Sequence, residues 1–121
     1  MNKNVRSIRP FIGAQDFDLS KRFYVDLGFE EVDLGSDLTL FKMASIAFYL
    51  QRAYVKDWVD NTMVFVELAD IDVFHKRLVT LDLPSSYPNV RVSGIRVQDW
   101  GRVCFVHDPS GILWQFGSFE R

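Results

Sequence analysis

The sequence has few residues that bind metals or form disulfides. It contains one cysteine, Cys104, and two histidines, His75 and His107. A single cysteine cannot form a disulfide within the chain, and its place in an apolar run indicates a core residue. His75 is predicted on the solvated face of a helix. His107 directly precedes an Asp-Pro-Ser-Gly turn and is expected to cap that turn.

An excess of charge of one sign is also missing. The chain has 14 Lys and Arg against 16 Asp and Glu, so its net charge of −2 creates no field that would attract nucleic acid or an anionic membrane. No apolar run approaches the ~18 residues typical of a membrane-spanning helix, and the N-terminus lacks the apolar core of a signal peptide. We therefore expect a cytoplasmic protein without a nucleic-acid or membrane partner.

Apolar and aromatic residues are abundant. Hydrophobic residues make up 48% of the 121 residues, and 11 Phe, 4 Tyr and 3 Trp bring the aromatic content to 15%. A chain of this size and composition buries one sizeable core. We therefore predict a single domain over residues 1–121.

The first half of the chain predicts one β-α-β-β-β unit over residues 5–51. Residues 5–13 alternate like a strand, and Asp16 precedes a stretch with apolar residues at helical spacing that ends at Gly28. Three short β-prone runs follow, separated by turn residues. This order predicts one helix packed against a four-stranded sheet.

The second half repeats this plan. A polar linker over residues 52–61 precedes a second unit over residues 62–119, in which residues 62–69 form a strand and Asp70 caps a helix. We expect Pro84 to end that helix, and three more strands to lie within 90–97, 102–107 and 112–117. Self-similarity of this kind indicates a duplicated unit. The predicted class is α+β, with two curved mixed sheets that enclose a cavity.

Strand alternation predicts which side chains face that cavity. A helix covers one face of each sheet and leaves the other face open. In the first strand, alternation places Ile8, Pro10 and Ile12 under the helix and turns Arg9 and Phe11 toward the cavity. By the same rule Val64, Val66, Trp114 and Phe116 pack under the second helix, whereas Met63, Phe65, Glu67 and Gln115 face the open side.

Two motifs carry a resemblance to a known superfamily. With the duplicated plan, "FYVDLGFEEV" after the first helix and "WGRVCFVHDPSGILWQFG" near the C-terminus resemble the vicinal oxygen chelate superfamily of glyoxalases, extradiol dioxygenases and bleomycin resistance proteins. The segments "DNTMVFVELADID" and "DWGRVCFVHDPSG" are most similar to the bleomycin-resistance branch. The resemblance implies the glyoxalase/bleomycin-resistance fold.

The resemblance also identifies the positions at which metal-dependent members place His, Gln or Glu ligands. In this chain those positions are Arg9, Tyr49, Met63 and Gln115. A hard divalent cation prefers oxygen or imidazole donors with compensating negative charge, and this set offers neither a carboxylate nor an imidazole. We therefore predict no metal site, no cofactor and no catalytic residue of the metal-dependent type.

In the bleomycin-resistance branch, a homodimer sequesters the drug in grooves at its interface, where aromatic rings stack on flat heterocycles. The resemblance therefore implies a homodimer that binds a planar or aromatic small molecule without a metal. It nominates Trp100 and Phe65 as stacking residues and Leu38 at a position where an aromatic ring is expected, while Trp58 lies in the linker as a rim residue. The full predicted ligand-binding set is Arg9, Leu38, Tyr49, Trp58, Met63, Phe65, Trp100 and Gln115.

Two other interpretations stay open from the sequence. The chain could be a lyase or isomerase of the glyoxalase type, or a dioxygenase-like enzyme, with an atypical site. Tyr49, Gln115 and His107 would then carry the acid-base chemistry. It could also be a regulatory or structural domain with a vestigial pocket.

Overall fold

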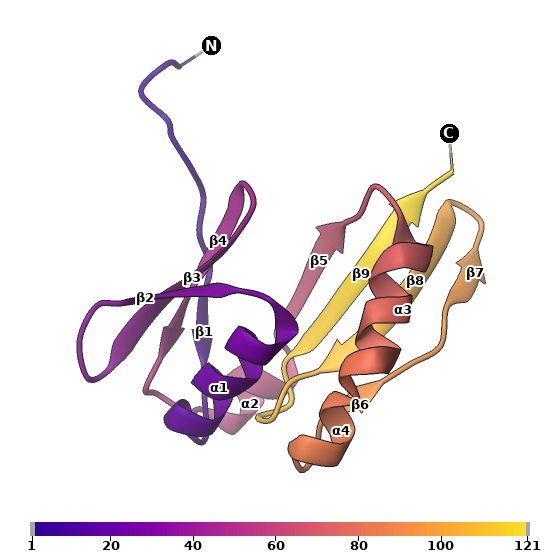
Figure 1. Cartoon of the computed structure of the whole chain (residues 1–121). Coiled ribbons are helices and arrows are strands. Elements are labelled where there is room, and N and C mark those ends of the chain that lie inside the picture. Colours follow the sequence, from indigo (N-terminus) through magenta and orange to yellow (C-terminus); the bar gives the residue numbers. More distant parts are fainter. Residues whose placement is uncertain (1, 121) are drawn as a thin grey trace.

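Two curved mixed sheets, each with a long helix on one face, make up the structure (Figure 1). The computed structural model describes residues 2–120. The first sheet has the order β1-β4-β3-β2, and the second has the order β5-β9-β8-β6, with β7 also paired to β8. The strands are β1 (Phe11–Gly13), β2 (Glu30–Asp33), β3 (Leu38–Met43), β4 (Ile46–Gln51), β5 (Met63–Glu67), β6 (Arg91–Val92), β7 (Arg96–Gln98), β8 (Gly101–His107) and β9 (Leu113–Phe119).

The two sheets repeat one pairing pattern. Each contains one parallel pair, β1 with β4 and β5 with β9, and its other pairs are antiparallel. A helix connects the strands of each unit, as a β-α-β crossover requires. The predicted α+β class with a duplicated plan is therefore confirmed.

The first helix, α1 (Phe17–Leu27), has the predicted bounds. The Asp16 side chain accepts a hydrogen bond from the Leu19 amide at 3.1 Å, which satisfies one of the free N–H groups of the first turn. Gly28 ends the helix with φ 124°, a conformation that costs a residue with a side chain much more. Phe23 and Leu27 are buried beneath α1 against the sheet.

The second long helix, α3 (Ile71–Leu81), begins where predicted but ends differently. Asp70 accepts hydrogen bonds from the Asp72 and Val73 amides. Asp82, with φ 48°, ends the helix in the left-handed conformation, and Pro84 lies in the first turn of the short helix α4 (Leu83–Ser86). The prediction that Pro84 ends the helix is therefore wrong, because proline fits a first helical turn, where its missing N–H has no partner.

The N-terminal segment also departs from the prediction. The strand expected over residues 5–13 is reduced to β1, and the preceding residues project away from the body of the molecule (Figure 1). Ile8, predicted under the first helix, is 94% exposed, and Pro10 is exposed as well. Pro10 has no N–H to donate to a sheet, so the ladder begins only at its carbonyl oxygen, which accepts a hydrogen bond from the Tyr49 amide at 2.9 Å. Ile12 is buried, as predicted, and Phe11 is 58% exposed on the opposite face of β1, which was predicted to face the cavity.

The linker and one predicted strand differ from the prediction. The linker contains a short helix, α2 (Lys56–Asp60), and the strand predicted within residues 90–97 consists of β6 and β7 with a break between them. Each longer helix of residues 2–120 has 11 residues, about half the length that crosses a bilayer, so none of the helices described can span a membrane.

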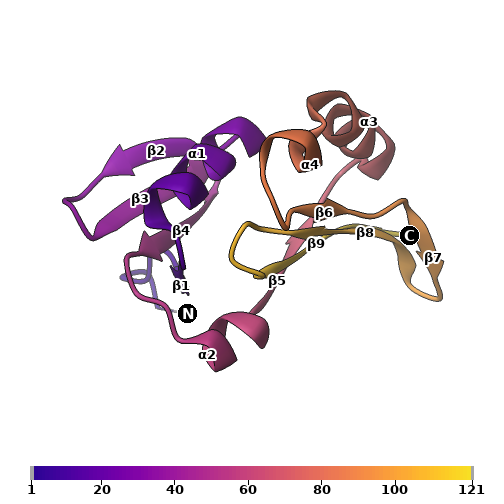
Figure 2. The ribbon, with the colours of Figure 1, turned by 90° about the horizontal axis from the view of Figure 1, so that it is seen from below.

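Both units contribute to one hydrophobic core. Trp114 of β9 lies with its ring centroid 5.1 Å from Phe48 of β4 and 5.7 Å from Tyr24 of α1. Trp114 and Phe116 are buried, which confirms that they face the helix layer. Figure 2 shows α3 and α4 on one side of the second sheet, so the opposite face is left open.

A buried hydrogen-bond cluster of Tyr24, Asp108 and Trp114 links the two units. The Tyr24 hydroxyl donates to Asp108 Oδ2 at 2.6 Å and accepts from Trp114 Nε1 at 2.8 Å. Asp108 Oδ1 accepts from the amides of Ser110, Gly111 and Ile112, each at 2.9 Å. Asp108, rather than the expected His107, therefore caps the β8–β9 turn, because its carboxylate can accept several hydrogen bonds at once.

Removing the Tyr24 hydroxyl tests this cluster. In Tyr24→Phe, the Trp114 N–H loses its acceptor and Asp108 loses a donor, both in the core, so we expect the free energy of unfolding to fall by about 1–3 kcal/mol. Denaturant unfolding measures the change. The matched control is Tyr54→Phe, whose side chain is partly exposed. Equal stability of the two variants would contradict a linking role for Tyr24.

The same variant has a characteristic pH dependence. Burial, and then the charge of Asp108, raise the pKa of Tyr24 well above its ordinary value of 10.0. The folded state therefore keeps this proton where the unfolded chain loses it, and the stabilisation is present below pH 10 and lost as pH rises further. The stability difference between wild type and Tyr24→Phe should thus shrink above about pH 10.

Candidate functional site

The faces of the two sheets that no long helix covers, called here the open faces, carry Tyr49, Met63, Phe65 and Gln115 of the predicted site residues. In β5, Val64 and Val66 pack on the core, whereas Met63, Phe65 and Glu67 are exposed. This alternation is the predicted one. Cross-strand pairing places Gln115 beside Phe65 and opposite Phe105, on the same open face.

An aromatic cluster of Phe65, Trp100 and Phe119 lies on the open face of the second sheet. The ring centroid of Phe65 is 5.7 Å from that of Trp100 and 5.9 Å from that of Phe119, and the last two are 5.1 Å apart. Phe65 is 42% exposed and Trp100 37% exposed, so their rings contact one another and also solvent. Phe119, which sequence reasoning missed, completes the cluster.

Gly117 makes room for these rings. A Cβ atom on Gly117 would lie 2.9 Å from the Phe65 ring and 3.1 Å from the Trp100 ring. Both distances are shorter than ordinary packing permits for a rigid ring. The glycine therefore lets two rings lie directly over the β9 backbone.

The open face of the first sheet carries a smaller group. The Tyr49 ring stacks on Phe11 with centroids 4.7 Å apart, and Arg9 Nη1 donates to the Tyr49 hydroxyl at 3.1 Å. The Arg9 guanidinium also lies 5.8 Å from the centre of the Tyr49 ring. The structure thus brings Arg9 and Tyr49 together as predicted neighbours, with Phe11 added.

Of the other predicted residues, Met63 and Gln115 are also paired. Gln115 Nε2 lies 2.8 Å from Met63 Sδ, across the parallel pair of β5 and β9. Leu38 lies at the start of β3, opposite Gln51. Trp58 is on α2 and 72% exposed, and no ring contact among the described residues joins it to the aromatic cluster.

An apolar groove of about 240 Å³ lies between the two sheets. Residues of β4 form one wall, and residues of β5 and β9 form the other. Apart from Glu67, the lining side chains are apolar, and Phe65 joins the groove to the aromatic cluster. The groove is lined by Pro10, Ile46, Ala47, Phe48, Val64, Phe65, Val66, Glu67 and Trp114.

The four positions at which metal-dependent members of the superfamily place ligands, Arg9, Tyr49, Met63 and Gln115, are called here the corner positions. Their side chains do not fit a divalent metal. Arg9 adds positive charge and already binds Tyr49, while the Gln115 amide points its N–H₂ group at the Met63 thioether. Within residues 2–120 no three His, Cys, Asp or Glu side chains are grouped closely enough to hold a metal ion. Cys104 is buried, and burial raises the pKa of its thiol to about 11, as expected for a core residue.

Both histidines lie at the predicted places in the chain, but their contacts differ from those expected. His75 is partly buried, and its Nε2 lies 2.9 Å from the Ser93 carbonyl oxygen, so it joins α3 to the loop after β6. His107 is opposite Arg91 in the β6–β8 pair and faces the open side of the second sheet. Burial and then the neighbouring Arg91 lower the pKa of His107.

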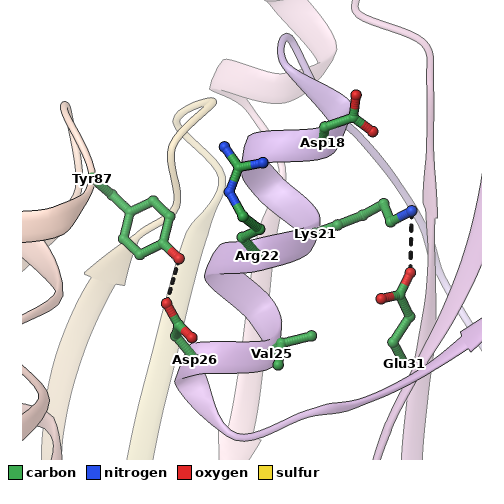
Figure 3. A pocket seen from close by; sticks show the side chains of 7 residues that line it. All are labelled: Asp18, Lys21, Arg22, Val25, Asp26, Glu31 and Tyr87. Atoms are coloured by element: carbon green, nitrogen blue, oxygen red, sulfur yellow. Dashed lines mark hydrogen bonds and ion pairs between the residues drawn. The ribbon is translucent and has the colours of Figure 1, made fainter.

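A hollow of about 470 Å³ along α1 is less suited to a ligand, although it is larger. Figure 3 shows Lys21 paired with Glu31 on one side of the helix and Tyr87 bonded to Asp26 on the other. These side chains satisfy one another on a solvated helix face. The hollow is therefore explained by structural contacts between α1 and its neighbours.

Comparison with solved structures shows which proteins share this fold. A bleomycin resistance determinant encoded on the transposon Tn5 superposes with a TM-score of 0.82, at 19% identity over 97% of this chain and 100% of that one. A bleomycin-binding protein from bleomycin-producing Streptomyces verticillus, complexed with copper(II)-bleomycin, gives a TM-score of 0.78 at 25% identity, over 96% and 99% of the two chains.

An enzyme shares the fold too. Lactoylglutathione lyase from Agrobacterium tumefaciens superposes with a TM-score of 0.68 at 18% identity, over 94% of this chain and 98% of that one. No protein-family model matches the sequence, and no curated protein is similar enough in sequence to count as a relative. The chain therefore has the glyoxalase/bleomycin-resistance fold, which confirms the resemblance that its motifs predicted.

Proposed function

We propose that this protein binds a planar, aromatic small molecule on its open sheet faces without a metal ion. The observation that carries the proposal is the aromatic cluster, in which Phe65, Trp100 and Phe119 expose ring surface to solvent on one sheet face. Exposed apolar surface that is gathered in one place commonly marks a binding site. The adjoining apolar groove extends this surface between the sheets.

The corner residues support binding without a metal. Arg9, Tyr49, Met63 and Gln115 satisfy one another through hydrogen bonds and offer no carboxylate or imidazole to a cation. A binding site needs shape and ring contact, which these faces provide. Of the three solved structures reported above, the bleomycin resistance determinant and the bleomycin-binding protein have the highest TM-scores. This similarity supports sequestration of a planar drug-like compound.

We further propose that two copies associate through the open faces and the N-terminal segment that precedes β1. Met63 is 61% exposed, and Phe11, Ile8 and Val5 also expose most of their apolar side chains. Apolar surface of this extent is stabilised when a second chain covers it. A homodimer would enclose the aromatic cluster and turn an open face into a cleft.

Replacing Trp100 tests the ring-binding site. In Trp100→Ala the ligand loses a stacking partner, so its dissociation constant should rise about 2- to 10-fold, as expected for one aromatic contact. Calorimetric titration with bleomycin and a panel of planar drugs measures this, and wild-type affinity should be the same with EDTA present. Tyr54→Ala is the control. Unchanged affinity in Trp100→Ala would contradict the assignment, and loss of binding in EDTA would contradict metal independence.

A substitution on the N-terminal segment tests the dimer. Sedimentation equilibrium of the wild type should give twice the chain mass. Ile8→Asp places a charge where we expect an apolar contact between copies, and it should shift the protein toward the monomer. Val79→Asp, at an exposed position of α3, is the matched control and should leave the mass unchanged. A monomeric wild type, or a dimer unaffected by Ile8→Asp, would refute this arrangement.

A further inference from the structure

A basic hollow lies at the other end of the open face of the second sheet. It has a volume of about 370 Å³ and contains three basic side chains, Arg91, Arg96 and His107. No acidic residue lines it. The remaining lining residues are Val92, Ser93, Phe105 and Leu113.

Strand pairing explains why the three basic groups converge. Arg91 of β6 is opposite His107 of β8, and residues opposite each other in an antiparallel pair project from the same face. Arg96 of β7 reaches the same face from the other short strand, and its guanidinium lies 5.3 Å from the centre of the Phe105 ring. This contact between the guanidinium and the ring holds the Arg96 side chain over the sheet, whereas a freely solvated arginine would have no such restraint.

The positive charge of the basic hollow is not balanced by a nearby acid. Neither Arg91 nor Arg96 takes part in an ion pair within residues 2–120, in contrast to Arg52 and Arg102. A neighbouring hollow of about 270 Å³ shares Arg91 and His107 and has no acidic lining residue either. Two guanidinium groups that share a concave surface without a counter-charge favour a bound anion.

The basic hollow and the aromatic cluster lie on one continuous surface. Across the sheet, Phe65 is beside Gln115, Gln115 is opposite Phe105, and Arg96 covers Phe105. Gln115 lies on β9 and Arg91 on β6, and one strand, β8, lies between them. At the usual strand spacing the two strands are therefore about 10 Å apart. A ligand of two or three fused rings spans that distance.

We propose that the ligand is an aromatic acid, whose carboxylate, sulfonate or phosphate group binds to Arg91, Arg96 and His107 while its ring packs against Phe65 and Gln115. This inference rests on the proposed function and adds the chemical class of the ligand. It favours anionic aromatic compounds over cationic drugs, because the basic hollow repels a cation.

Two dyes with the same ring system test the proposal. 1-Anilinonaphthalene-8-sulfonate carries a sulfonate, and N-phenyl-1-naphthylamine is its neutral counterpart. In the double variant Arg91→Gln/Arg96→Gln the dissociation constant of the sulfonate should rise about tenfold or more, as expected for lost charge-assisted hydrogen bonds. That of the neutral dye should stay the same. Fluorescence titration measures both.

A charge-matched control separates a local site from an effect of net charge. Arg22→Gln/Lys76→Gln also removes two positive charges, at exposed positions of α1 and α3, and should leave the affinity for both dyes unchanged. Arg91→Lys keeps the charge and should retain most of the sulfonate binding. Circular dichroism verifies that each variant is folded.

The outcomes distinguish the two proposals. Sulfonate affinity that is equal in wild type and in Arg91→Gln/Arg96→Gln overturns the anion site, and so does an equal loss for both dyes. If the neutral dye binds the wild-type protein in either of these two cases, the proposed function is not contradicted. Failure of both dyes to bind the wild-type protein contradicts the proposed function and the anion site with it.

Discussion

The hydrogen bond from Tyr24 to Asp108 connects the two halves of this molecule, and the position of the open faces depends on it. Tyr24 belongs to α1 of the first unit, whereas Asp108 begins the turn between β8 and β9 of the second. Trp114 adds a further hydrogen bond and packs against Phe48. Buried polar groups that are fully satisfied specify one arrangement of their neighbours. The two sheets therefore hold a defined relation, with the groove between them.

Much of this arrangement follows from local sequence signals. Asp16 and Asp70 identified both helix starts because their carboxylates satisfy free amide groups, and alternation in β5 and β9 separated core from open face. The N-terminal strand was overestimated because alternation cannot show whether a neighbouring strand is there to pair with. Ile8 accordingly lies in solvent rather than under a helix.

The basic hollow could not be predicted for a related reason. Arg91 and Arg96 lie on strands of two and three residues, too short for any periodic pattern, and they approach His107 only through pairing with β8. Phe119 was missed because its partners Phe65 and Trp100 are far from it in sequence. Sites assembled by sheet pairing are visible only when the register of the strands is known.

The glyoxalase/bleomycin-resistance fold supports more than one kind of chemistry, and its side chains decide which one a given chain performs. Here the corner positions hold Arg9, Tyr49, Met63 and Gln115, and the open face beside them carries rings. The most direct test of ring binding is the indole N–H spectrum of the ¹⁵N-labelled protein during titration with naphthalene-2-sulfonate. Our account predicts that the Trp100 signal shifts, and that it shifts more than the signal of Trp114, whose N–H group is bonded to Tyr24 in the core. A Trp100 signal that does not move at saturating ligand would contradict it.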